Sequence, residues 1–242
     1  MQSSWMEFGG AGDLANDFFK KYNFLAIPAG NTGTQMGGWF RKEINTVDDL
    51  KGLKFRIAGF AGQIFAKMGT IPQQVAGGDI YPSLEKGTID AAEWVGPYDD
   101  EKLGFQKVAK YYYYPGWWEG GAMLHNFINL DKWNALPKNY QAIVRAASAQ
   151  AHTWMLGKYD SANPQALKRL VAGGALLRPF PQPVMEASYK AATDTYAEVS
   201  AKNADFKKVY DSMVAFRGDE YLWWQVAELG FDSFMVRMRS RG

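Results

Sequence analysis

Residues 53–69, LKFRIAGFAGQIFAKMG, hold the pattern that decides the fold: a short strand, a glycine, a helical segment and a second glycine. In LKFRIAG, apolar Phe55 and Ile57 alternate with Arg56, which is the period of a β-strand. GFAGQIFAKMG then has helical spacing, and Gly69 ends that helix. A strand that leads directly into a helix is the basic unit of an α/β protein.

Similar passages between helix and strand occur on both sides of this stretch. Before it, DLANDFFKKYNF predicts a helix and FLAIPA a strand, and TVDDLKG opens one helical turn with Thr46 and Asp49 as a capping-box variant. After it, IYPSLEKGTIDAAEWV and FQKVAKYYYYPGW each pass from helix to strand, the second up to Pro115. From Leu130 onward nearly everything has helical period, with interruptions expected at Pro164, at 173–174 and at 179–183.

Composition excludes several classes of protein. With 242 residues, 47% apolar and 15% aromatic, the chain can bury one large core or two smaller ones. A net charge of +2 with scattered basic residues argues against nucleic acid as a partner. Without cysteine there is no disulfide or thiolate metal site. No stretch reaches the roughly 20 apolar residues of a membrane span, and the N-terminus lacks signal-peptide character, so as written we expect neither export nor anchoring.

Three long motifs carry a resemblance to a known family: residues 31–60, NTGTQMGGWFRKEINTVDDLKGLKFRIAGF; 84–100, LEKGTIDAAEWVGPYDD; and 108–119, VAKYYYYPGWWE. Together the chain resembles the DctP-type solute-binding proteins of TRAP transporters, and among them the branch that binds 2-oxo acids and hydroxy acids of the pyruvate or lactate type. The likeness covers essentially the whole chain, and several long motifs in the same order make it specific.

The resemblance implies a periplasmic-binding-protein type II-like α/β fold of two domains, with the ligand in a cleft and long C-terminal helices. Residues 1–29 and 113–153 would be the remainder of domain I, 30–112 domain II, and 154–242 helices that bridge the domains. It also implies a periplasmic receptor that performs no chemistry and delivers its ligand to TRAP membrane permease subunits. Family members begin with a signal peptide and a βα-rich segment, so we expect this chain to lack the family's N-terminal segment and domain I to be incomplete.

The same likeness assigns site residues. The family uses the arginine at the position of Arg56 to hold the substrate's carboxylate, as a planar guanidinium can. Gln35, the Glu93–Trp94 pair and Glu119 match residues that gather oxygen ligands around a cation, Na⁺ or Ca²⁺, which also touches the substrate. The expected carboxylate-binding residues are therefore Arg56, Gln35, Trp94, Glu93 and Asn31, and the expected metal ligands are Gln35, Glu93, Trp94 and Glu119.

Elementary chemistry is consistent with this set, and it leaves alternatives open. Two glutamates converging near a bound carboxylate would have raised pKa values unless a cation lay among them, and oxygen ligands suit a hard ion. On pattern alone, however, Arg56 could form a salt bridge, and either glutamate could be a solvated surface acid. A glycoside hydrolase using Glu93 and Glu119 as general acid and base is the alternative function. We expect Arg56 to depress the pKa values of both glutamates, and this disfavours the hydrolase, which needs one glutamate protonated as its general acid.

Aromatic residues and histidines outside this set have plainer interpretations. The tyrosines at 111–114 and the pair Trp117 and Trp118 suggest a stacking platform, but alternation along a strand favours packing on its two sides. His125 and His152 have no second histidine at ligand spacing, so we expect both to be structural.

The C-terminal tail predicts assembly. Two helical stripes are followed by WWQVAELGFDSFMV, which adds more apolar surface than one solvent-facing helix can leave exposed. Members of the resembled branch dimerise by exchanging a C-terminal helix, which implies a homodimer here. Alternatively, the stripe covers the protomer's own core.

Overall fold

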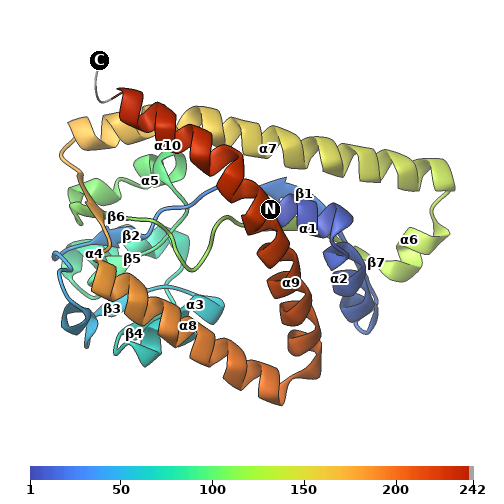
Figure 1. Ribbon diagram of the computed structural model, residues 1–242, viewed down its shortest axis with the longest axis horizontal. Coiled ribbons are helices and arrows are strands. Elements are labelled where there is room, and N and C mark those ends of the chain that lie inside the picture. The colour runs from blue at the N-terminus through green and yellow to red at the C-terminus, as the bar shows by residue number, and fades with distance from the viewer. Residues whose placement is uncertain (240–242) are drawn as a thin grey trace. The chain divides into compact units, whose positions relative to one another are not determined.

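A computed structural model describes residues 1–239 of the chain (Figure 1). The chain divides into two compact units, each built from separated segments. Unit 1 comprises Met1–Pro28, His125–Ile143 and Glu198–Gly242, and unit 2 comprises Ala29–Leu124 and Val144–Ala197. None of the helices described between residues 1 and 239 has both the length and the apolar character needed to cross a bilayer.

A six-stranded mixed sheet forms the centre of unit 2, with the strand order β4-β3-β5-β2-β6-β8. Strand β3 runs parallel to both β4 and β5, whereas β2 is antiparallel to its neighbours β5 and β6, and β8 lies parallel to β6. Trp39 of β2 pairs with Ala92 on one side and with Tyr112 on the other. The strands are β2 (Gly38–Phe40), β3 (Lys54–Arg56), β4 (Ile71–Gln73), β5 (Ala91–Ala92), β6 (Tyr111–Tyr114) and β8 (Leu176–Pro179).

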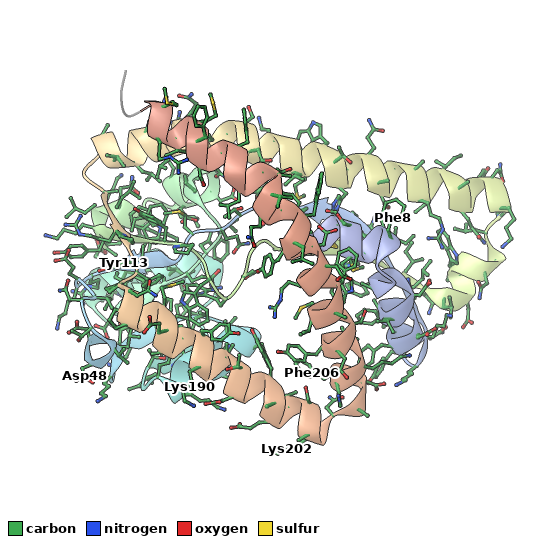
Figure 2. All side chains as sticks on the ribbon, viewed as in Figure 1. Phe8, Asp48, Tyr113, Lys190, Lys202 and Phe206 are labelled. Carbon is green, nitrogen blue, oxygen red and sulfur yellow. The ribbon has the colours of Figure 1, made fainter. Side chains whose placement is uncertain are left out.

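Alternation along these strands buries side chains on both faces of the sheet. Phe40, Phe55 and Tyr113, the last labelled in Figure 2, belong to one core cluster, and Trp39 and Tyr112 belong to the other. All five are at most 1% exposed. The prediction that the tyrosine run packs on two sides of a strand is therefore confirmed.

Helices cover each face of the sheet and complete an α/β fold of three layers. On one face, α3 (Gly59–Lys67) contributes Ile64 and Phe65, and α8 (Gln182–Lys202) contributes Val184 and Ala192. The outer side of α8 carries Lys190 (Figure 2), which pairs with Asp194 at 2.7 Å. The other face is covered by α4 (Ile80–Lys86) and by the end of α7 (Lys138–Ala172). Short elements of unit 2 are η1 (Val47–Leu50), η2 (Gly77–Asp79), α5 (Pro97–Leu103) and η3 (Phe105–Lys107).

Unit 1 is mainly helical. Asn16 of α2 joins helix to strand, because its Nδ2 donates to the carbonyl of Ala26 at 3.1 Å and its Oδ1 accepts from the Ala26 amide at 2.8 Å. Trp5 Nε1 donates to Ser212 Oγ at 3.2 Å, which links α1 to α9. The helices are α1 (Gln2–Phe8), α2 (Ala11–Lys20), α6 (Leu130–Ala135), α9 (Ala204–Val226) and α10 (Glu228–Arg239). The strands β1 (Phe24–Asn31) and β7 (Met123–Asn129) pair in a two-stranded sheet, and each belongs only partly to unit 1.

Local predictions are confirmed except at Pro164 and at Leu176–Pro179, where strand β8 lies in a segment expected to be mostly helical. The Thr46–Asp49 capping box forms, with Asp49 Oδ2 accepting from the Thr46 amide at 2.8 Å. The expected interruption at Pro164 is wrong, because α7 continues through it to Ala172. Proline removes only one N–H from the helical ladder, and Leu170 packs into the core beyond it, so tertiary packing outweighs the local cost.

Candidate functional site

A hollow of about 280 Å³ opens at the edge of the unit 2 sheet where β3 and β5 end and β2 begins. Five of the six predicted site residues line it. Polar and apolar side chains are mixed in its wall, which consists of Gln35, Arg56, Ile57, Ala58, Ala61, Glu93, Trp94, Val95, Trp118, Glu119 and Ala122. The antiparallel direction of β2 brings Gln35 to the same edge as the carboxyl ends of β3 and β5.

Arg56 is the cation at the centre of the wall. Its Nη1 donates to the backbone carbonyl of Glu93 at 2.6 Å and lies 3.3 Å from Glu93 Oε2, and its Nε donates to the carbonyl of Val75 at 3.3 Å. The guanidinium also lies over the ring of Trp94, 5.1 Å from the centroid. These contacts hold the planar group in one orientation, which prepares it for a carboxylate.

Glu93 follows β5 directly and is 8% exposed. Burial raises the pKa of this carboxyl to about 8; Arg56 acts in the opposite direction, and the negative charges of Glu119 and Asp100 raise it further. Burial also raises the pKa of Glu119. Arg56 thus acts on Glu93 in the expected direction, but the expectation that both glutamate pKa values are depressed is wrong, because both are raised. The desolvation of a buried carboxylate outweighs one guanidinium beside it.

Asp100, a residue outside the predicted set, supports the loop that carries Glu93 and Trp94. Its Oδ1 accepts from the backbone amides of Val95 and Gly96 at 3.3 and 3.2 Å, at the start of α5. The carboxylate is 1% exposed, and its pKa is raised to about 6 by burial. An acid in the first turn of a helix that starts with Gly-Pro is the local signal that could have identified Asp100.

The second oxygen of Asp100 is held by two aromatic residues. Trp39 Nε1 and Tyr112 Oη donate to Oδ2 at 2.9 and 2.7 Å, and the two rings stack at 3.8 Å between centroids. One buried carboxylate thus satisfies four donors, and it connects the loop to the middle of the sheet.

Gln35 is fixed by a separate group of hydrogen bonds. Its Nε2 donates to Thr32 Oγ1 at 3.2 Å, so the acceptor Oε1 is the other end of the amide. Thr32 Oγ1 also accepts from the amide of Ala122, and the amide of Gly116 donates to the Gln35 carbonyl at 3.2 Å. The segment that carries Glu119 is thereby tied to the loop before β2.

Asn31 is the predicted site residue that does not line the hollow in the described part of the chain. It ends β1 and is 6% exposed, and its Oδ1 accepts from the amide of Gly33 at 2.8 Å. The geometry gives it a role in shaping the turn after β1.

Trp118 forms an apolar part of the wall that sequence reasoning did not assign to the site. It follows β6, and its ring lies edge-on to Phe55 and Phe65 at 6.2 and 5.0 Å. Neither His125 nor His152 lines the hollow. The residues next to Trp118 in the sequence give no signal that distinguishes a tryptophan lining the hollow from one buried in the core.

The donor set determines which metal could bind. Across residues 1–239 no three side chains of His, Cys, Asp or Glu are grouped to hold a metal, so a zinc-type site is not formed. The hollow instead offers two carboxylates and one amide oxygen. Burial is the main cause of the raised pKa of Glu93, and a bound cation would stabilise the ionised form of this carboxyl. These residues fit a hard, oxygen-preferring ion.

Comparison with known proteins agrees with this geometry. A monocarboxylate 2-oxoacid-binding periplasmic protein of Nostoc sp. is 48% identical over 233 residues, which are 96% of this chain and 64% of that protein. The chain therefore spans less than two thirds of the length of this curated relative.

Solved structures are equally similar. A TRAP transporter solute-binding protein from Bordetella bronchiseptica RB50 is 49% identical with a TM-score of 0.95, over 99% of this chain and 71% of that one; it is a mixed-occupancy dimer with copurified calcium and picolinate in one active site. A TRAP periplasmic solute-binding protein from Pseudoalteromonas atlantica T6c, with bound sodium and pyruvate, is 40% identical with a TM-score of 0.91, over 96% and 71%.

Residues 2–203 match the DctP family, whose description is bacterial extracellular solute-binding protein, family 7. This match covers most of the chain, and the two solved relatives share its fold over nearly all of it. The chain belongs to the DctP family of bacterial extracellular solute-binding proteins.

Proposed function

We propose that this protein is the extracytoplasmic receptor of a TRAP transporter and binds a small monocarboxylate, a 2-oxo acid such as pyruvate or a hydroxy acid, together with Na⁺ or Ca²⁺. The observation that carries the proposal is a fixed guanidinium, a buried carboxyl group and a partly buried one in the wall of one small hollow. With both glutamates ionised, Arg56, Glu93 and Glu119 carry a net charge of −1, which Na⁺ alone, or Ca²⁺ together with a monocarboxylate, neutralises.

Each lining residue has a physical role in this proposal. Arg56 donates to the ligand's carboxylate, and the carbonyls of Glu93 and Val75 keep its guanidinium in place. Glu93, Glu119, the Gln35 amide oxygen and the Trp94 carbonyl would hold the cation, which supplies positive charge to the acid's oxygens. The rings of Trp94 and Trp118 exclude water from the apolar part of the ligand.

The hydrolase alternative retains one physical argument, because a carboxyl with a pKa of about 8 is protonated at neutral pH and could act as a general acid. Against it stand the family, which is one of solute-binding proteins, and the relatives with pyruvate or picolinate bound. A receptor needs only to bind its ligand and release it, and the residues that line the hollow can bind the ligand.

Calorimetry with pyruvate tests the proposal, using protein expressed with any coding sequence that flanks this chain in its gene. Titrations are run in calcium, in sodium and after chelation with exchange into a large organic cation. Saturable binding that requires calcium or sodium is expected. Absence of binding in every condition, together with turnover of an aryl glycoside that Glu93→Gln abolishes, would establish the alternative.

The location and the partners of this protein are inferred from its relatives. We infer a periplasmic protein that passes its ligand to membrane permease subunits, because the Nostoc relative is named periplasmic and the Bordetella relative belongs to a TRAP transporter.

The C-terminal helices support a homodimer. No residue of α9 or α10 is buried, and large apolar side chains on them are 45–72% exposed: Tyr221, Leu222, Trp223, Val226, Leu229, Phe231, Phe234, Met235, Val236 and Met238. The Bordetella relative was solved as a dimer. Light scattering on the protein with and without residues from Tyr221 onward tests this, and a monomeric intact protein at micromolar concentration would contradict it.

A further inference from the structure

The indole of Trp94, a residue that lines the hollow, is approached closely by a glycine. Trp94 lines the hollow, and Gly77 does not. A Cβ built on Gly77 would lie 2.8 Å from Cη2 of the Trp94 ring, 3.3 Å from Cζ3 and 3.6 Å from Cζ2. A contact of 2.8 Å is closer than real Cβ atoms approach, so the ring occupies space that any side chain at 77 would need.

Backbone conformation does not explain this glycine. Gly77 begins the turn η2, and its φ lies outside the left-handed region that favours glycine. The three atoms nearest to its absent Cβ all belong to Trp94. Val75, two residues earlier in the same segment, accepts a hydrogen bond from Arg56 Nε, so one loop supports both the guanidinium and the ring.

The ring cannot move freely to accommodate a side chain at 77. The guanidinium of Arg56 lies over the ring, 5.1 Å from its centroid. A Cβ at 77 would therefore force the indole or the η2 turn to shift, and a shifted indole changes the shape of the hollow that it lines.

We propose that Gly77 determines ligand size. Because residue 77 has no side chain, the Trp94 indole lies farther from the hollow, and the hollow admits carboxylates whose body is flat and as large as an aromatic ring. This inference rests on the proposed function of the site. The small lining residues Ala58 and Ala61 are consistent with such a ligand class, because they leave room beyond the carboxylate. The solved relatives hold acids that range from pyruvate to picolinate.

Gly77→Ala tests the proposal, and Gly78→Ala is its matched control. A Cβ on Gly78 meets no atom within 4 Å, and its φ is also outside the left-handed region. In calorimetry at saturating calcium, Gly77→Ala is expected to weaken picolinate binding about tenfold and pyruvate binding less than about threefold. Gly78→Ala should leave both affinities at the wild-type values. A general loss of folding would weaken both acids equally, so the ratio of the two affinities is the decisive readout.

A double substitution separates the ring contact from other effects. Phenylalanine at 94 lacks the outer ring atoms that meet residue 77, so Gly77→Ala added to Trp94→Phe should change neither affinity further. An unchanged affinity ratio in Gly77→Ala, or an equal loss on the Trp94→Phe background, overturns the inference while the proposed function stands. Wild-type protein that binds neither acid overturns both.

Discussion

Cation binding is expected to release a proton, and cation affinity should therefore rise steeply with pH. In the cation-free protein the pKa of Glu93 is raised to about 8, so roughly one molecule in a hundred has this carboxylate ionised at pH 6, and half have it ionised at pH 8. Only the ionised form is a cation ligand, so the apparent association constant should rise roughly 50-fold between these values. Cation affinity rises with pH because the pKa of Glu93 is raised: protons compete with the cation below pH 8, and this competition ends above pH 8.

Calcium titrations by calorimetry measure this effect, and repeating them in buffers of different ionisation enthalpy counts the protons released. The acid ligand is held at saturation and is ionised throughout the range. Glu85→Gln is the control, because Glu85 is an exposed carboxylate on α4 of the same unit. An association constant that stays level from pH 6 to pH 8, with no proton released, would refute the assignment of Glu93 as a buried cation ligand.

Three further outcomes are expected. Arg56→Lys should weaken carboxylate binding by about 1.5 to 3 kcal/mol, because an ammonium cannot reproduce the guanidinium's charge-assisted geometry; calorimetry showing unchanged affinity would remove Arg56 from the site. Asp100→Asn places an amide donor against donors that Asp100 now satisfies, and urea denaturation should show a loss of about 1 to 3 kcal/mol in the free energy of unfolding; no loss would mean that the four bonds are not maintained. Glu119→Gln should weaken cation and acid binding together, since the two ligands are thermodynamically linked; acid affinity that is insensitive to chelation in the unmodified protein would exclude that linkage.

Local patterns predicted the part of the fold that depends on neighbours in the sequence. Alternation around Arg56 placed it opposite Phe55, and the structure has Phe55 in the core and Arg56 in the wall of the hollow. The Thr46–Asp49 capping box needed only a three-residue spacing. The division into domains at residues 30–112 and 154–242 stays a prediction.

Features that depend on distant partners were not predictable in this way. Asp100 is 61 residues from Trp39, and nothing in the sequence near either residue indicates their hydrogen bond. The pKa of Glu93 depends on how completely the fold buries it, which outweighs the nearby charge of Arg56. Strand β8 at Leu176–Pro179 also escaped prediction, because its pairing with β6 joins segments more than sixty residues apart.

The strand order of the unit 2 sheet has a consequence for how the protein is made on the ribosome. The lining residues Gln35 to Glu119 are all synthesised before β8 and α8, yet α8 covers the sheet face that buries Phe40 and Phe55. A nascent chain that has left the ribosome as far as Ala122 therefore contains every residue that lines the hollow, but it lacks the helix that covers the sheet. Ligand present during synthesis should protect finished chains from proteolysis and leave chains stopped before α8 unprotected.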